Sequence, residues 1–484
     1  MGLNYQIRQK AAREERMNLR APLPKVMISG RLVDPLVEGG KGVNITNALS
    51  SGAWAKCGGV GTFSGTHADL YNEIGKYQPY TYKGVSRKDR HEELITQSIK
   101  GGIDQAKLAR DTSEGKGAIM MNLLWECGGI PQILEGVLEE AGHLIDGVVC
   151  GAGLPFQLAE ICAKREMYYN PIVSSELAFR ILWQRAFSKY PSWLGSVVYE
   201  DPWLAGGHNG ISSKEDPQKP EKPYDRVLKL RRFMNSVHLN DVTLIIAGGV
   251  WNLAEWSAII DCQELHPIAF QFGTRLLLTQ ESPISNEWKM KLFNVPEGQV
   301  KLHKFSPTGF YSSAINNAFL QELYSQVERE IPFRSLPEGD FVKEFKFGRR
   351  IVYVKSEDDE KIAKWAEKGY TDAMKTPDIT LIFVKPERRK QILQDQIDCI
   401  GCLNRCKFSN WDQHNENTGV LPDPRSFCIS KTLVDVGHGG SIEDNLLFSG
   451  HNVYRFALDP FYKNNHIPTV AEVYARIKEE YENS

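Results

Sequence analysis

The sequence predicts an α/β protein, a (β/α)8 TIM barrel followed by a smaller C-terminal α+β cysteine-cluster domain. From residue 24 onward, short apolar or β-branched runs alternate with helical patterns, which is typical of successive βα units. Eight such runs fall within about 250 residues, the usual size of this barrel. Glycine or polar residues follow the runs, where the active-site loops of a barrel lie. The predicted strands are residues 25–29, 58–63, 118–123, 147–151, 171–174, 195–200, 243–247 and 268–273.

Helical patterns separate these strands. The clearest are residues 95–110, 130–142, 154–165, 175–190 and 252–262. A doubly wound open sheet could be drawn from the same segments. The number of strands and the glycines after their ends favour the barrel.

The chain of 484 residues is longer than one hydrophobic core usually serves, so we expect more than one domain. Residues 1–21 are charged and helix-prone and are predicted as a leader helix. Residues 22–320 are predicted as the barrel, and residues 321–484 as a C-terminal extension that contains the cysteine cluster.

The charge balance excludes a general attraction to polyanions. Lys and Arg number 58 and Asp and Glu number 60, which gives a net charge of -2. No apolar run is long enough to span a bilayer, and the N-terminus has no apolar region of a signal peptide. We therefore expect a cytoplasmic protein with a small-molecule substrate and without a nucleic-acid or membrane partner.

The stretch AGGHNG at 205–210 is the clearest candidate site. Two glycines directly before His208 let the backbone pass close to a flat ligand while the imidazole points into the same space. The alternative is an ordinary glycine-rich turn whose histidine only makes a local hydrogen bond.

Two further glycine stretches follow the seventh and eighth predicted strands. Gly248 and Gly249 follow the seventh, and Gly273 and Thr274 end the eighth. In (β/α)8 proteins the loops at these two places commonly bind a phosphate through backbone N–H groups. The pair therefore predicts a phosphate-bearing cofactor.

Six motifs in this order carry a family resemblance. They are CGGVGT at 57–62, MNLL at 121–124, GAGLP at 151–155, AGGHNG at 205–210, AGGV at 247–250 and QFGTR at 271–275. Over roughly residues 22–317 the chain resembles the nitronate monooxygenase (2-nitropropane dioxygenase) family of FMN-dependent TIM-barrel oxidoreductases.

This resemblance implies an FMN site and a catalytic residue. The residues that match the family's cofactor-binding positions are Met27, Ile28, Ser29, Asn122, Gly207, Gly248, Gly249, Gly273 and Thr274. His208 matches the family's catalytic histidine, which lies beside the substrate and the flavin. Its adjustable pKa suits proton transfer or a hydrogen bond to an anion.

Four of the nine cysteines are clustered near the C-terminus. Cys399, Cys402 and Cys406 lie within eight positions, and Cys428 follows after 21 residues. Four thiolates at such spacing suit a [4Fe-4S] cluster or a structural zinc ion. The text DCIGCLNRC at 398–406 resembles the cluster loop of the dienoyl-CoA reductase and trimethylamine dehydrogenase flavoenzymes, which favours iron-sulfur over zinc.

Three functions are consistent with these patterns. The first is a nitronate monooxygenase-like enzyme that oxidises an anionic substrate with O2. The second is a reductase of an activated C=C bond that takes electrons from NAD(P)H or a ferredoxin-type donor, with the iron-sulfur cluster as a relay. The third is a flavin or iron-sulfur protein without catalytic activity that acts on a partner.

Overall fold

The computed structural model describes residues 20–72, 75–212 and 214–484. The predicted leader helix, residues 1–21, lies almost wholly outside them and stays a prediction. No helix of the described residues combines the length and the apolar character that crossing a bilayer requires.

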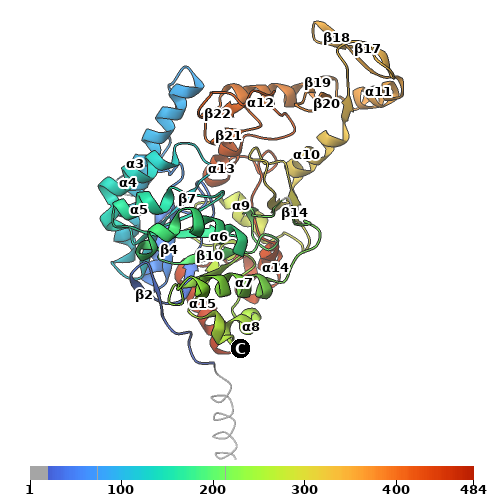
Figure 1. The fold of residues 1–484 in the computed structure, drawn as a ribbon. Helices are drawn as coiled ribbons and strands as arrows, with labels where there is room; N and C mark the ends of the chain where they lie inside the picture. The colour runs from blue at the N-terminus through green and yellow to red at the C-terminus, as the bar shows by residue number, and fades with distance from the viewer. Residues whose placement is uncertain (1–19, 73–74, 213) are drawn as a thin grey trace, which may run out of the picture.

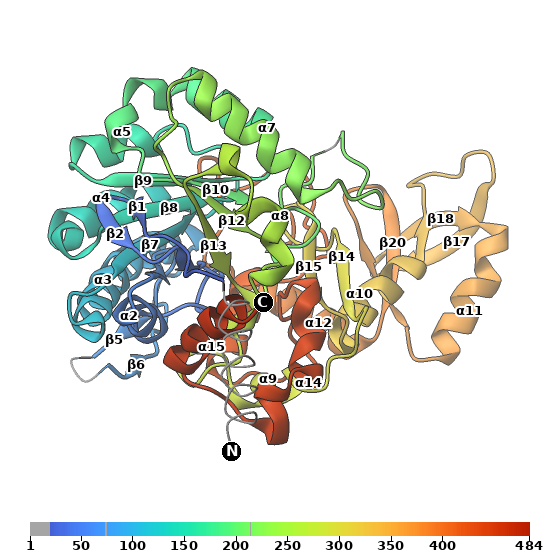
Figure 2. The same ribbon diagram turned by 90° about the horizontal axis from the view of Figure 1, so that it is seen from below.

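Eight parallel strands close into a barrel, which confirms the predicted fold class (Figures 1 and 2). In chain order the strands are β3 (Leu36–Glu38), β4 (Val60–Ser64), β7 (Ala118–Leu124), β8 (Gly147–Gly151), β9 (Tyr168–Val173), β10 (Val197–Glu200), β12 (Leu244–Ala247) and β13 (Ile268–Phe272). Most of their residues are buried, because the strands face the barrel interior on one side and helices on the other.

Helices surround the barrel, as Figure 2 shows. They are α2 (Ala48–Lys56), α3 (Arg87–Ser113), α4 (Ile130–Ala141), α5 (Leu158–Lys164), α6 (Glu176–Arg185), α7 (Pro223–Ser236), α8 (Ser257–Ile260) and α9 (Asn286–Leu292). The last helix of the chain, α15 (Val470–Glu482), packs against α2, where Tyr474 stacks edge-on against Trp54 at 4.8 Å between ring centroids. The C-terminus therefore completes the helical layer of the barrel.

The prediction for the first strand was wrong. Residues 26–28 form β1 (Val26–Ile28), which pairs antiparallel with β2 (Arg31–Val33) in a hairpin outside the barrel sheet. Ser29 and Gly30 both have positive φ, of 48° and 73°, and turn the chain back. The barrel begins instead at β3.

The hairpin closes the N-terminal end of the barrel. The hydroxyl of Thr243, just before β12, donates a hydrogen bond to the carbonyl of Met27 at 2.7 Å. Asn170 of β9 donates to Ser29 Oγ at 3.1 Å. The run 25–29 and the three-residue strand β3 are both short and mainly apolar. Only the pairing in the closed sheet distinguishes β3, a strand of the barrel, from β1, which lies in the hairpin at the end of the barrel.

A three-stranded sheet lies at the other end of the barrel. Its strands β14 (Val300–His303) and β15 (Ser312–Ile315) follow β13, and β11 (Gly207–His208), from the loop after β10, pairs with β15. Helix α10 (Ala318–Glu328) then leads to an α+β unit that projects from the molecule in Figure 1. This unit contains β16 (Glu330–Pro332), β17 (Phe341–Phe347), β18 (Arg350–Lys355), α11 (Asp359–Glu367), β19 (Asp372–Lys375) and β20 (Thr380–Val384).

The remaining chain returns to the barrel. Its elements are α12 (Pro386–Ile397), β21 (Arg405–Cys406), β22 (Trp411–Asp412), α13 (Ile429–His438), α14 (Arg455–Leu458) and α15. Residues of these elements share one hydrophobic core with the barrel helices. The α+β unit has a small core of its own, and its strands β19 and β20 also contribute Met374, Ile382 and Val384 to the larger core. The extension predicted from residue 321 thus contributes both a separate unit and a cover for the barrel.

Candidate functional site

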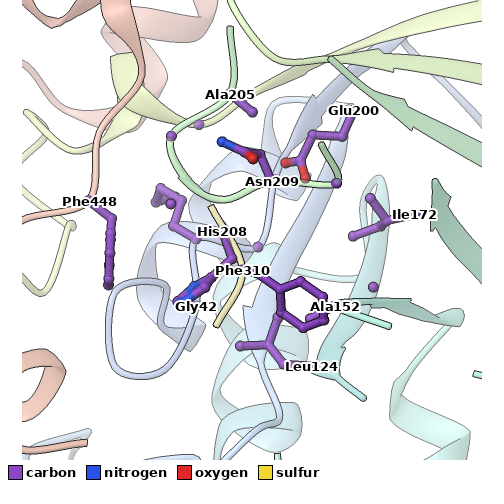
Figure 3. A pocket seen from close by; sticks show the side chains of 18 of the residues that line it. Gly42, Leu124, Ala152, Ile172, Glu200, Ala205, His208, Asn209, Phe310 and Phe448 are labelled. Carbon is purple, nitrogen blue, oxygen red and sulfur yellow. The ribbon is translucent and has the colours of Figure 1, made fainter. Parts of the chain in front are cut away.

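A cavity of about 440 Å³ lies at the carboxyl ends of the barrel strands, beneath the C-terminal cover (Figure 3). This is the end at which TIM barrels place their active sites. Seven of the residues predicted for the flavin and for catalysis line it: Asn122, Gly207, His208, Gly248, Gly249, Gly273 and Thr274. Residues 27–29 do not, because the hairpin places them at the opposite end of the barrel. The assignment of Met27, Ile28 and Ser29 to the cofactor site is therefore corrected; Met27 is 51% exposed to solvent.

The loop after β3, and not residues 27–29, lines the cavity. Gly39 and Gly40 pack so closely against neighbouring side chains that a Cβ at Gly40 would lie 2.3 Å from Asn122 Cγ. Asn122 is buried on β7, and neither its amide nitrogen nor its amide oxygen has a hydrogen-bond partner. Since buried amides are nearly always hydrogen-bonded, Asn122 is available to a ligand in the cavity.

His208 is held by the added sheet. Its strand β11 pairs with β15, and His208 Nε2 lies 2.5 Å from Ser306 Oγ. Ser306 is in turn 2.9 Å from Thr308 Oγ1. Burial lowers the pKa of His208 to about 4, so the imidazole is neutral at pH 7. The residue is therefore better suited to hydrogen bonding than to accepting a proton.

The glycine turns after β12 and β13 form one wall of the cavity. Gly248 and Gly249 have φ of 86° and 76°, and a Cβ at Gly248 would lie 2.9 Å from the backbone of Asp201. A Cβ at Gly273 would meet no atom within 4 Å, so this position faces open space. The turns thus combine close backbone packing with room for a bound group, which fits a phosphate.

The C-terminal cover reaches these turns. The amide of Gly450 donates to Thr274 Oγ1 at 2.9 Å, and Asn452 Nδ2 donates to the carbonyl of Gly249 at 2.6 Å. Phe448 also lines the cavity, with its ring centroid 5.2 Å from that of His208. Sequence reasoning missed this segment, and no local pattern marks it because it meets the site only through the tertiary fold.

Two further cavity residues were missed, although the sequence contains a signal for each. Glu200 is the last residue of β10, and a carboxylate at the end of a barrel strand is a common active-site feature. Burial, and to a lesser degree the charge of Asp201, raises the pKa of Glu200 to about 7. Asn209 directly follows His208, is buried, and has no partner for either polar atom of its amide.

The predicted cluster cysteines lie beside this cavity. All four thiols are buried or half-buried, and mutual electrostatic interactions link them: the thiols of Cys399, Cys406 and Cys428 add to the burial that raises the pKa of Cys402. Cys402 and Leu403 themselves line the cavity. Within the part of the chain that the structure describes, no three His, Cys, Asp or Glu side chains are arranged to hold a metal ion.

The cysteine loop is anchored to the barrel. The amide of Gly128, which follows β7, donates to the carbonyl of Cys402 at 3.0 Å, and the amide of Asn404 donates to the carbonyl of Glu126 at 2.8 Å. Backbone N–H groups of Phe408 and Ser409 donate to the sulfur of Cys406. The position of this loop against the cavity is therefore fixed by the backbone.

Fold and site together define a (β/α)8-barrel protein with a ligand cavity at the carboxyl ends of its strands and a cysteine loop in the cavity wall. No protein-family model and no curated protein matches the chain in sequence. FabK from Thermotoga maritima has a similar structure, with 13% identity, 92% of each chain covered and a TM-score of 0.51. The enoyl reductase domain of MlnA from the macrolactin biosynthesis cluster of Bacillus amyloliquefaciens is similar at 10% identity, with 93% of this chain and 94% of that chain covered and a TM-score of 0.51. At such identities the likeness is one of fold.

Proposed function

We propose that this protein is an FMN-dependent oxidoreductase that, like nitronate monooxygenases, oxidises a small nitronate-like substrate with O2. One observation carries the proposal: the glycine turns after β12 and β13 open into the same cavity as His208 and the unpartnered Asn122. A wall suited to a phosphate and free polar groups within one cavity are what a flavin and its substrate require.

The residues present fit FMN. The turns at Gly248–Gly249 and Gly273–Thr274 would hold the phosphate through backbone N–H groups, and the amide of Asn122 would meet a polar edge of the ring. Bound FMN would supply the redox chemistry. The protein supplies position, exclusion of water and hydrogen bonds.

His208 and Asn209 would orient the substrate. The neutral imidazole of His208 is fixed against Ser306, so it can hold a polar substrate group without changing its own charge. The unpartnered amide of Asn209 offers one N–H donor group beside it in the sequence and in the cavity. Nitro and carbonyl oxygens are acceptors for such donors.

The test is an anaerobic titration of the purified protein with ethyl nitronate, followed by the flavin absorbance at about 450 nm. We expect the nitronate to bleach this absorbance. In a separate aerobic assay we expect O2 uptake that depends on the nitronate. His208→Asn should reduce this turnover by about 100-fold or more, as loss of a positioned polar group in an active site does, with unchanged FMN content. Absence of bound FMN, or full turnover by His208→Asn, would refute the proposal.

A reductase of an activated C=C bond is the second candidate. It is favoured by the position of Cys402 and Leu403 in the cavity wall, because a redox group on the cysteines would adjoin one in the cavity. The structurally similar MlnA domain from the macrolactin biosynthesis cluster is also named an enoyl reductase domain. Bleaching of the flavin by NADPH or NADH, and none by the nitronate, would select this function. Bound flavin that no substrate bleaches would indicate a partner protein without catalysis.

We propose that the four cysteines hold a [4Fe-4S] cluster. Two observations support the proposal: the four cysteines have the sequence spacing of a cluster loop, and the thiols of Cys399, Cys406 and Cys428 interact electrostatically with that of Cys402. Iron and acid-labile sulfide should therefore be present in the anaerobically purified protein and be lost in Cys402→Ser. Cys57→Ser, at a cysteine outside the cluster, is the matched control. Zinc without iron would refute the assignment.

A further inference from the structure

We propose that Glu200 is the proton-transfer group of the cavity, and that it acts on a substrate carbon next to a nitro or acyl group. This inference rests on the proposed function and adds a substrate class to it, the neutral carbon acids. The proposal assigns the proton to the carboxylate and leaves His208 and Asn209 to hold the oxygen atoms of the substrate.

The carboxylate of Glu200 is placed to meet a substrate. Glu200 ends β10 and lines the cavity, and Figure 3 draws its carboxylate in the same region of the pocket as the amide of Asn209. Among the described residues, no hydrogen bond or ion pair engages this carboxylate, and only burial and the charge of Asp201 act on its pKa.

The adjacent carboxylate shows a contrasting arrangement. Asp201 Oδ1 accepts hydrogen bonds from the amides of Trp203 and Leu204, each at 3.0 Å, and Asp201 Oδ2 accepts one from the hydroxyl of Tyr199 at 3.0 Å. Asp201 therefore fixes the loop after β10. Glu200, one residue earlier, has no structural bond to break when it gains or loses a proton.

The surroundings of Glu200 supply no free positive charge that would lower its pKa. The other titratable side chains that line the cavity are Lys41, His67, Glu126, Cys127, His208 and Cys402. Lys41 is paired with the buried Glu38 at 2.8 Å, and burial lowers the pKa values of His67 and His208 to about 4. No cavity residue therefore offers a free positive charge to Glu200, and its pKa of about 7 suits exchange of protons at neutral pH.

His208 is less suited to this task. Its Nε2 is engaged by Ser306, and a base with a pKa of about 4 takes protons from carbon only weakly. In this proposal His208 forms a hydrogen bond to the substrate, and Glu200 acts as the base.

The step balances without an oxidant. The carboxylate of Glu200 takes a proton from the carbon, the C–H bond breaks and an O–H bond forms. The electron pair of the broken bond moves onto a nitro or carbonyl oxygen, where the N–H of Asn209 can donate to it. The apolar side chains of Leu124, Ile172 and Phe310 line the same cavity and would hold the hydrocarbon part of the substrate.

The experiment is hydrogen exchange of nitroethane in D2O, followed by proton NMR under anaerobic conditions with the FMN-loaded protein. The wild type should remove the CH2 signal faster than buffer, with a rate that rises with pH around a midpoint near 7. Glu200→Gln should lower the protein-dependent rate by about 100-fold or more, the usual contribution of a general base. Glu126→Gln, at another carboxylate of the cavity wall, should keep the same midpoint.

Each outcome separates the two proposals. Exchange by Glu200→Gln at the wild-type rate, or no exchange by the wild type, would overturn the role of Glu200, while nitronate bleaching of FMN would still support the proposed function. Absence of bound FMN would overturn the proposed function instead. If Glu200→Gln fails to fold or to bind FMN, Glu200→Asp decides: it keeps a carboxylate, and exchange lowered with an unchanged midpoint near 7 is expected, whereas an unchanged rate would refute the proposal.

Discussion

At the scale of single residues, burial of His208 and burial of Glu200 change the pH dependence of the free energy of unfolding in opposite directions. The pKa of His208 is lowered from 6.5 to about 4, so between these pH values the unfolded chain binds more protons than the folded one. The pKa of Glu200 is raised from 4.5 to about 7, so over that interval the folded chain binds more protons. His208 therefore makes the free energy of unfolding rise with pH, and Glu200 makes it fall.

This opposition gives a prediction for urea unfolding of the FMN-free protein between pH 4.5 and 6.5. Relative to the wild type, His208→Asn should flatten the rise of the free energy of unfolding with pH, because it removes a group that the unfolded state protonates. Glu200→Gln should steepen that rise, because it removes a group whose contribution to the free energy of unfolding falls as pH increases. Parallel pH curves for the wild type and both variants would contradict the two shifts.

At the scale of elements, the turn after β13, which we propose to hold a phosphate, depends on the last helix of the chain. Arg275, directly after Thr274, is fully buried, and its guanidinium donates to both carboxylate oxygens of Glu480 on α15, at 2.9 and 3.1 Å. It also donates to the carbonyl of Trp251 at 2.6 Å. Arg275 is thus held by protein groups and not aimed at a cofactor phosphate.

Glu480→Gln should lower the free energy of unfolding by about 3 kcal/mol, since it removes the nearer carboxylate of a buried charge and leaves only Asp459, at 3.9 Å. Urea unfolding measures this difference. Glu479→Gln is the matched control on the same helix, because Glu479 is exposed and, among the described residues, its carboxylate pairs with Arg476 alone, at 3.3 Å. This substitution should change the free energy by less than about 1 kcal/mol. Equal effects of the two substitutions would show that α15 does not support the turn in this way.

At the scale of the whole molecule, three hydrophobic cores divide the stability. One fills the barrel interior, one joins the barrel to its helices and to the C-terminal cover, and one belongs to the α+β unit. The third core comprises Ile331, Phe333, Val352, Val354, Leu381 and Phe383. Strand β20 contributes to this core through Leu381 and Phe383 and to the large core through Ile382 and Val384. The outer hairpin β17–β18 contributes only to the small core, so this hairpin can open locally while the cavity stays intact.

Val352→Asp should make the α+β unit accessible to a protease without loss of bound FMN. Val352 is 2% exposed, so a carboxylate there is buried without a partner. Limited proteolysis, with cleavage sites mapped by mass spectrometry, should find new cuts between residues 333 and 383. Val342→Asp, at a position of 59% exposure on the same hairpin, should be cut like the wild type. Loss of FMN from Val352→Asp would instead couple this unit to the cavity.

The sequence by itself determined the barrel and the place of several cavity residues. Seven of the eight predicted strands overlap a barrel strand, and the glycines at 248, 249 and 273 line the cavity, while their role in phosphate binding stays a prediction. These features are local: alternation of strands and helices sets the fold class, and a glycine after a strand marks a turn wherever the strand lies.

Only the tertiary structure decided which element begins the barrel and what covers it. The choice between residues 25–29 and β3 depends on pairing with β13, more than 200 residues away. The positions of Cys402, Phe448 and α15 at the barrel likewise depend on contacts between distant segments. Such contacts arise because exposed apolar faces of separate segments bury one another, and no periodicity within either segment specifies its partner.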